Sequence, residues 1–83
     1  MKVNDLAKTS GYTRGCLEHF EFWICDYENY TYYKITAPSI DEYIFLCDRD
    51  IIEWTFEEDM RISIMVKAEP KDREIFKNKS VSM

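Results

Sequence analysis

The sequence has few of the residues that build flexible linkers, disulfide frameworks or membrane spans. Two glycines, two prolines and three cysteines occur in 83 residues. Long flexible linkers are therefore not expected, and a chain of this length makes one domain. Its apolar runs are a few residues long, far short of the roughly 20 residues of a transmembrane helix. We expect no association with a membrane.

The cysteines and the single histidine are too scattered to suggest a metal centre. Cys16, Cys25 and Cys47 are odd in number, and the polar segment 1–11 lacks the apolar core of a signal peptide. We therefore expect reduced thiols and an intracellular, cytoplasmic location. Together with His19 these cysteines could supply a zinc site, but structural zinc ligands usually come in close pairs on tight turns. Packed thiols and a surface imidazole are the simpler interpretation, so we expect no metal.

Patterns typical of catalysis are also missing. His19 shares no strand face with both Cys16 and Cys25, and no glycine-rich oxyanion loop surrounds them. The paired carboxylates fall in predicted turns and helix caps, where water solvates both members, whereas acid catalysis needs one carboxyl with a raised pKa in a pocket. No glycine-lysine phosphate loop occurs. We predict a protein that is not an enzyme and binds no cofactor.

The net charge of −5 limits the partners that the chain can hold. Nucleic-acid phosphates and anionic membrane surfaces would repel an acidic domain, so direct binding to either is not expected. A protein partner with a basic surface would attract it. An acidic surface that serves solubility alone remains the alternative.

Alternating apolar residues predict two β-hairpins. Residues 18–26 place Phe20, Phe22 and Ile24 on one face, residues 26–29 have turn chemistry, and residues 30–36 form the returning strand. Residues 50–67 form the second hairpin, whose turn carries three successive carboxylates. Its inward residues are predicted to be Ile52, Trp54, Phe56, Ile62, Ile64 and Val66.

Two short helices are predicted beside the hairpins. Residues 2–9 place Val3, Leu6 and Ala7 on one face, and Gly11 supplies a left-handed C-cap. Between the hairpins, Ser39 and Glu42 match a capping box that starts a helix over residues 40–46. We therefore predict an α+β fold, in which one helix covers a small four-stranded antiparallel sheet made of two β-hairpins, with a short helix between them and a short N-terminal helix. The domain is expected to span residues 1–69, followed over 70–83 by a short helical turn and a flexible tail.

The predicted turns gather acids and tyrosines, which makes them the candidate partner-binding residues. Carboxylates two apart on a strand stand roughly 6–7 Å apart, a spacing similar to that of neighbouring phosphates in nucleic acid. Such an array could occupy a basic groove built for DNA or RNA, and exposed tyrosines are favoured interface anchors. A solvated acidic face and tyrosines that pack in the core are the alternatives. The candidates are Asp26, Glu28, Tyr30, Tyr32, Asp48, Asp50, Glu53, Glu57, Glu58 and Asp59.

Three segments carry a resemblance to known proteins. Residues 39–43 (Ser-Ile-Asp-Glu-Tyr), 48–54 (Asp-Arg-Asp-Ile-Ile-Glu-Trp) and 61–66 (Arg-Ile-Ser-Ile-Met-Val) are similar to short acidic accessory proteins of phages and mobile elements of Gram-positive bacteria. Some accessory proteins of this size and charge are anti-CRISPR or other anti-defence inhibitors. The resemblance implies a stoichiometric inhibitor that occludes the nucleic-acid-binding surface of a CRISPR or other nuclease effector. A structural or regulatory accessory protein that forms a homodimer through a sheet edge is the alternative.

Overall fold

The computed structural model describes residues 1–11, 14–76, 78 and 80–82, which form a small α+β domain. Along the chain lie α1 (Val3–Ser10), the 3-10 helix η1 (Arg14–His19), β1 (Phe20–Asp26), β2 (Thr31–Thr36), α2 (Ile40–Leu46), β3 (Ile51–Phe56), β4 (Ile62–Lys67), α3 (Asp72–Phe76) and β5 (Ser80–Ser82). The predicted fold class, both hairpins, the N-terminal helix and the helix between the hairpins are confirmed. None of the helices in the described ranges has the length and apolarity that crossing a bilayer requires.

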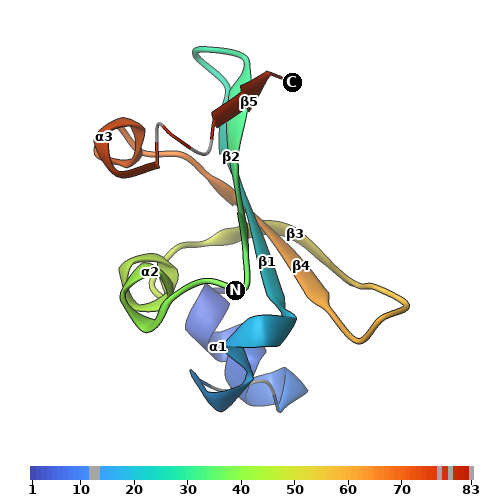
Figure 1. Cartoon of the computed structure of the whole chain (residues 1–83). Helices are drawn as coiled ribbons and strands as arrows, with labels where there is room; N and C mark the ends of the chain where they lie inside the picture. The colour runs from blue at the N-terminus through green and yellow to red at the C-terminus, as the bar shows by residue number, and fades with distance from the viewer. Residues whose placement is uncertain (12–13, 77, 79, 83) are drawn as a thin grey trace.

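The strands form one sheet in the order β3-β4-β1-β2-β5, and the sheet is mixed rather than wholly antiparallel. Each hairpin is antiparallel as predicted, but β1 and β4 run parallel, with Phe22 beside Ile64. This pairing places side by side the two strands that have the most buried residues, β1 and β4. Helix α2 provides the long connection that delivers β3 to the far edge (Figure 1).

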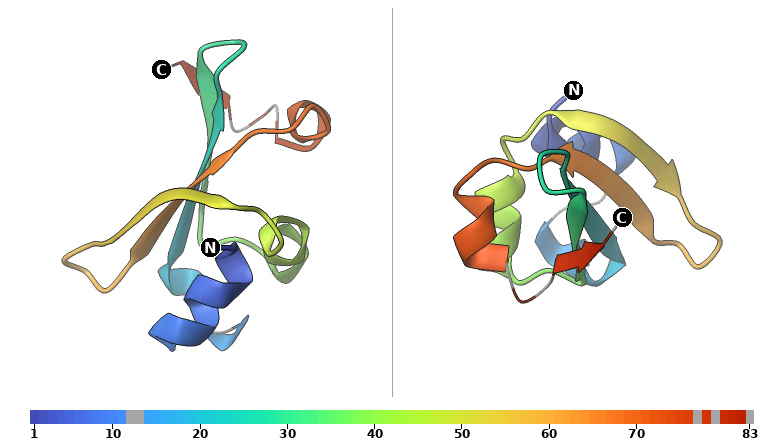
Figure 2. Two further views of the ribbon diagram at one scale, coloured as in Figure 1. Left: turned by 180° about the vertical axis from the view of Figure 1, so that it is seen from behind. Right: turned by 90° about the horizontal axis from the view of Figure 1, so that it is seen from above.

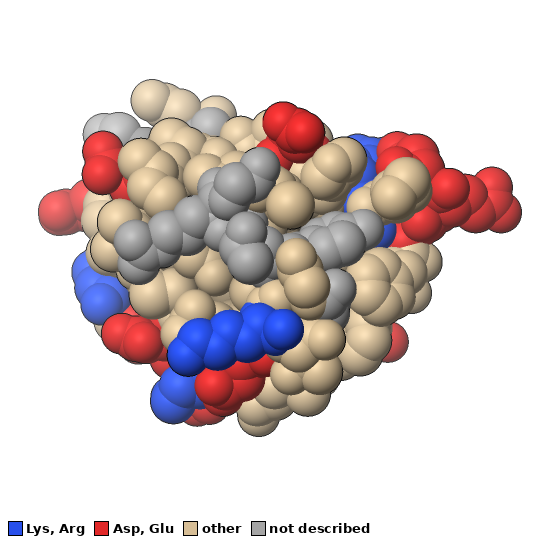
Figure 3. Space-filling view, turned by 90° about the horizontal axis from the view of Figure 1, so that it is seen from below, with Lys and Arg blue, Asp and Glu red and all other residues tan. Residues whose placement is uncertain are grey.

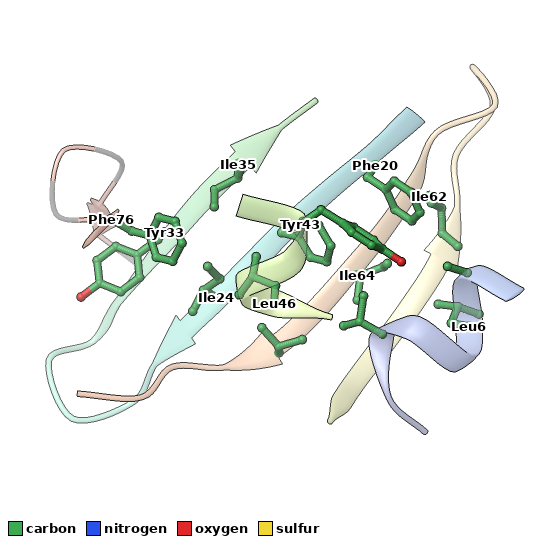
Figure 4. Close-up of a cluster of buried hydrophobic side chains, with 14 residues drawn as sticks. Leu6, Phe20, Ile24, Tyr33, Ile35, Tyr43, Leu46, Ile62, Ile64 and Phe76 are labelled. Carbon is green, nitrogen blue, oxygen red and sulfur yellow. The ribbon is translucent and has the colours of Figure 1, made fainter. Parts of the chain in front are cut away.

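The helices gather on one side of the sheet. Helices α2 and α3 lie together on that side, α1 lies near the start of β1, and the β3–β4 hairpin projects away from them (Figures 1 and 2). Leu6 of α1 and Tyr43 and Leu46 of α2 close over Ile64 and the other strand residues of the core (Figure 4). The opposite face of the sheet carries no helix in the described part of the chain.

Local sequence signals place both predicted helices correctly. Gly11 ends α1 with φ of 81°, a left-handed conformation that favours glycine. At α2 the Glu42 amide donates to Ser39 Oγ at 3.1 Å, and the Ser39 amide donates to Glu42 Oε1 at 2.9 Å. These reciprocal bonds confirm the capping box.

The predicted inward face of β3 is wrong. Ile52, Trp54 and Phe56 are 47%, 39% and 51% exposed, whereas their neighbours on β4 are buried. The register does place Trp54 opposite the buried Ile64, so the alternation of β3 was interpreted correctly there. However, β3 is an edge strand on a projecting hairpin, beyond the cover of the helices, and a bulge between Ile51 and Glu53 breaks the alternation.

The C-terminal segment is more ordered than the predicted flexible tail. Helix α3 lies within the expected helical turn, but its Phe76 is buried against Tyr33 and Phe45. Strand β5 then pairs with β2. The aromatic contacts give the tail apolar surface to bury, which charge alone did not predict. Of the predicted loop and tail, Tyr12, Thr13, Lys77, Lys79 and Met83 lie outside the described residues.

Candidate functional site: an acid-rimmed groove

Several of the candidate acids already bind cations of the same chain. Asp26 is 4% exposed and accepts hydrogen bonds from Asn29 Nδ2 at 2.9 Å and Arg73 Nε at 3.1 Å. These bonds, first that of Asn29 and then that of Arg73, lower the pKa of the Asp26 carboxyl from 3.8 to about 2, against the opposing effect of burial. Glu28 pairs with the same arginine at 2.7 Å. Asp26 and Glu28 therefore fasten α3 to the β1–β2 turn.

Two more candidate acids are paired nearer the second hairpin. Asp50 lies 3.4 Å from Lys2 Nζ, which also donates to the backbone carbonyl of Asp48. Asp59 Oδ2 accepts from Arg61 Nε at 2.8 Å within the hairpin turn. In these pairs the carboxylates are neutralised by a base of the same chain but stay exposed to water.

Four candidate acids keep their charge uncompensated. Asp48, Glu53, Glu57 and Glu58 are exposed, and within the described ranges none forms an ion pair with a lysine or arginine. Glu57 accepts a hydrogen bond from Ser63 Oγ at 3.1 Å. Figure 3 shows acidic atoms projecting at the right, where the β3–β4 hairpin ends, with basic atoms beside them. Apart from Asp48, which precedes β3, the uncompensated acids of the predicted array therefore lie on the second hairpin.

Glu53 and Glu57 border a groove on the sheet face that the helices leave uncovered. The groove has a volume of about 320 Å³, and we call it the acid-rimmed groove. Its position follows from strand alternation, because the residues beside the buried Phe22 and Ile64 point to the opposite face. It is lined by Glu21, Trp23, Glu53, Trp54, Thr55, Glu57, Ser63 and Met65.

The register explains how these residues meet. Trp23 of β1 lies beside Met65 of β4, and Met65 lies opposite Glu53 of β3. One row across the sheet therefore runs from an indole through a thioether to a carboxylate. The neighbouring row runs from Glu21 through Ser63 to Thr55, so apolar and polar surfaces lie side by side.

Glu21 lies at the inner side of the groove and is a residue that the sequence pattern did not single out. It is 5% exposed, although alternation alone places it on a solvated face. Lys34 Nζ lies 3.1 Å from one carboxylate oxygen, and Arg61 Nη1 and Ser63 Oγ lie 3.5 and 3.4 Å from the other. Its three partners come from β2, the hairpin turn and β4, so no local motif could have predicted this cluster.

The candidate tyrosines do not form one surface with the acids. Tyr32 packs against Trp23 with ring centroids 4.9 Å apart, which extends the aromatic side of the groove. Lys34 Nζ lies 4.9 Å from the centroid of the Trp23 ring, a cation–π distance. Tyr30 is exposed in the β1–β2 turn, far from the projecting hairpin (Figure 1). The aromatic contribution to the site therefore comes from the strands and not from that turn.

The thiols and the imidazole do not converge. The described residues contain no group of three or more histidine, cysteine, aspartate or glutamate side chains that could hold a metal ion. Burial raises the pKa of the Cys25 thiol above its ordinary value, which disfavours the reactive thiolate.

The chain matches no family model, no curated protein and no solved structure.

Proposed function

We propose that the chain is a non-enzymatic protein-binding module that docks on a basic surface of a partner protein. The acid-rimmed groove would supply the buried contacts, and the hairpin tip, residues 57–60, would steer the approach. The observation that carries this proposal is the difference between the acids: those outside the second hairpin are largely paired within the chain, whereas Glu53, Glu57 and Glu58 lie uncompensated beside apolar surface. Such a surface is complementary to lysine and arginine.

The specific form of this proposal is an anti-defence inhibitor of a phage or mobile element. It would act in the bacterial cytoplasm by covering the nucleic-acid-binding surface of a CRISPR or other nuclease effector. The resemblance of residues 39–43, 48–54 and 61–66 to acidic phage accessory proteins supports this class. Because most of the uncompensated acids lie on one hairpin, a contact with a few basic residues is favoured over a long phosphate mimic.

The test is competition between the chain and nucleic acid for purified effectors captured by the tagged chain from a Gram-positive host. Binding should weaken as the salt concentration rises. The chain and the nucleic acid should each displace the other from the effector. The double reversal Glu57→Lys with Glu58→Lys should slow association about tenfold. The matched control Glu74→Lys with Glu18→Lys changes net charge equally on other elements. Salt-independent binding, or equal slowing by the control, would contradict the proposal.

A second function, self-assembly through a sheet edge, is favoured by the exposure of β3. Five of its six residues are exposed, and the strand pairs on one side alone. The Glu57 amide donates to the Arg61 carbonyl just beyond the strand, so alternation turns the backbone groups of Trp54 away from β4 and toward the open edge. Size exclusion with light scattering at high protein concentration tests this: a dimer that Ile52→Lys dissociates is expected, and a monomer at all concentrations contradicts it.

A further inference from the structure

We propose that the acid-rimmed groove receives one arginine side chain of the partner. The aliphatic part would lie on Met65 and Trp23, and the guanidinium would lie between the carboxylates of Glu53 and Glu57. This inference rests on the proposed function and names the group that the docking surface recognises.

The size of the groove matches a side chain. Its volume of about 320 Å³ lies at the small end of the range of ligand pockets, which is roughly 300–1,000 Å³. It is an open groove on a sheet face, and not a deep cleft that would enclose a cofactor. A long side chain that enters from a partner surface fits these dimensions.

The charges around the groove favour a cation. The two bases nearest to it, Lys34 and Arg61, are already paired with Glu21, and Arg61 also binds Asp59. Glu53 and Glu57 therefore leave the groove with excess negative charge. A neutral side chain would leave these carboxylates without a partner, and an acidic one would be repelled.

The arrangement of apolar and acidic atoms favours arginine over lysine. A guanidinium has five donors in a planar fork and can bond two carboxylates at once, whereas an ammonium is a compact point charge. The carboxylates lie at two places along the hairpin, one on β3 and one beyond its end.

The chain offers a direct readout, because the side chain of Trp23 lies on the groove face beside Met65, whereas Trp54 borders the groove with its side chain on the face of Ile64. We would titrate the intact protein with the capped tripeptide Gly-Arg-Gly and follow the two indole N–H signals by NMR, assigned with Trp23→Phe and Trp54→Phe. Gly-Lys-Gly and Gly-citrulline-Gly are the comparison probes, since citrulline has the shape of arginine without its charge. We expect a saturable shift of the Trp23 indole with arginine, a smaller shift of the Trp54 indole, and at least about fivefold weaker binding of lysine. Citrulline should cause no saturable shift.

Single neutral variants locate the site. Glu53→Gln and Glu57→Gln should each weaken the arginine probe about three- to tenfold. Glu58→Gln removes a neighbouring charge that does not line the groove, and Glu74→Gln removes one from α3; both should leave affinity within about twofold.

The outcomes separate this inference from the proposed function. No saturable shift up to about 20 mM of the arginine probe, equal binding of citrulline, or equal effects of Glu53→Gln and Glu58→Gln would overturn the arginine site. If salt-dependent binding to an effector survives in that case, the protein-docking function stands without it. If the effector competition fails while the probe binds, the groove recognises arginine but the inhibitor function is contradicted.

Discussion

Acidic side chains at the C-terminal helix and at the second hairpin have opposite roles. Asp72 of α3 is fully buried and forms a two-pronged pair with Arg49, at 2.6 and 2.9 Å. Glu53 and Glu57 are exposed and bind no cation in the described part of the chain. The same residue type thus anchors a helix in one region and borders an open groove in the other. The difference lies in whether a base from a distant part of the chain reaches the acid.

The most direct test of this difference is to remove the buried carboxylate of Asp72. Asp72→Ala leaves Arg49 buried with Glu69 as its remaining acidic partner, at 3.1 Å. Because an unpaired buried charge is costly, we expect a loss of about 3 kcal/mol in the free energy of unfolding, measured by urea denaturation. Glu74→Gln on the same helix should cost less than about 0.5 kcal/mol. A loss below about 1 kcal/mol for Asp72→Ala would mean that this pair does not anchor α3.

Asp26 tests the same idea through pH. Its pKa of about 2 in the folded chain lies below the ordinary 3.8, so the carboxylate stabilises the fold fully above about pH 4. That contribution is lost as the pH falls through the folded pKa, because the unfolded chain binds the proton first. Asp26→Asn should cost about 1–2 kcal/mol at pH 7 and flatten the stability curve between pH 4 and 2. An unchanged acid limb in the variant would show that other carboxyls dominate.

The loss of stability on removing Glu21 should lie between that for the buried, paired Asp72 and that for the exposed acids of the hairpin. Glu21→Ala removes a buried carboxylate, but its partners Lys34 and Arg61 are partly exposed and regain water. We therefore expect a loss of about 1 kcal/mol at neutral pH, smaller than that for Asp72→Ala. Thermal unfolding of both variants in one buffer compares them directly. A larger loss for Glu21 would assign the groove a structural role as well.

The smallest effect on stability is expected at the hairpin. Glu53→Gln, Glu57→Gln and Glu58→Gln should each change the free energy of unfolding by less than about 0.5 kcal/mol, since they break no ion pair. Urea denaturation of the triple variant measures the combined change in the free energy of unfolding, for comparison with that of Asp72→Ala. A loss above about 1.5 kcal/mol would show that these acids hold the hairpin together, and would contradict their assignment to binding.

Local chemistry predicted much of the fold. Alternation identified four strands, and the Ser39–Glu42 capping box and Gly11 located two helix boundaries, because each signal depends on neighbours in sequence. The exposure of Trp54 was not predictable in this way, since its alternation is correct and only its place at the sheet edge removes its cover. The parallel pairing of β1 and β4 likewise depends on how the hairpins assemble.

The candidate site was predictable in part. The hairpin acids Glu53 and Glu57 follow from the turn pattern, and they do border the groove. The pairing of Asp26 with Arg73 across 47 positions could not be foreseen, because it depends on where α3 docks. Trp23 and Met65 entered the site for a similar reason: the residues belong to separate hairpins that only the sheet register brings together.

The parallel contact between β1 and β4 has a consequence for synthesis of the protein. Phe20 pairs with Ile62 and Cys25 with Lys67, so the centre of the sheet joins the first third of the chain to the last. Closing such a large loop costs entropy before any contact repays it, which slows folding. During translation the first hairpin must wait with both edges open, because its neighbours β4 and β5 leave the ribosome later. The nascent chain therefore passes through a state with unpaired strand edges that is prone to aggregation. A sheet whose neighbouring strands were all consecutive in sequence would expose fewer such edges during synthesis.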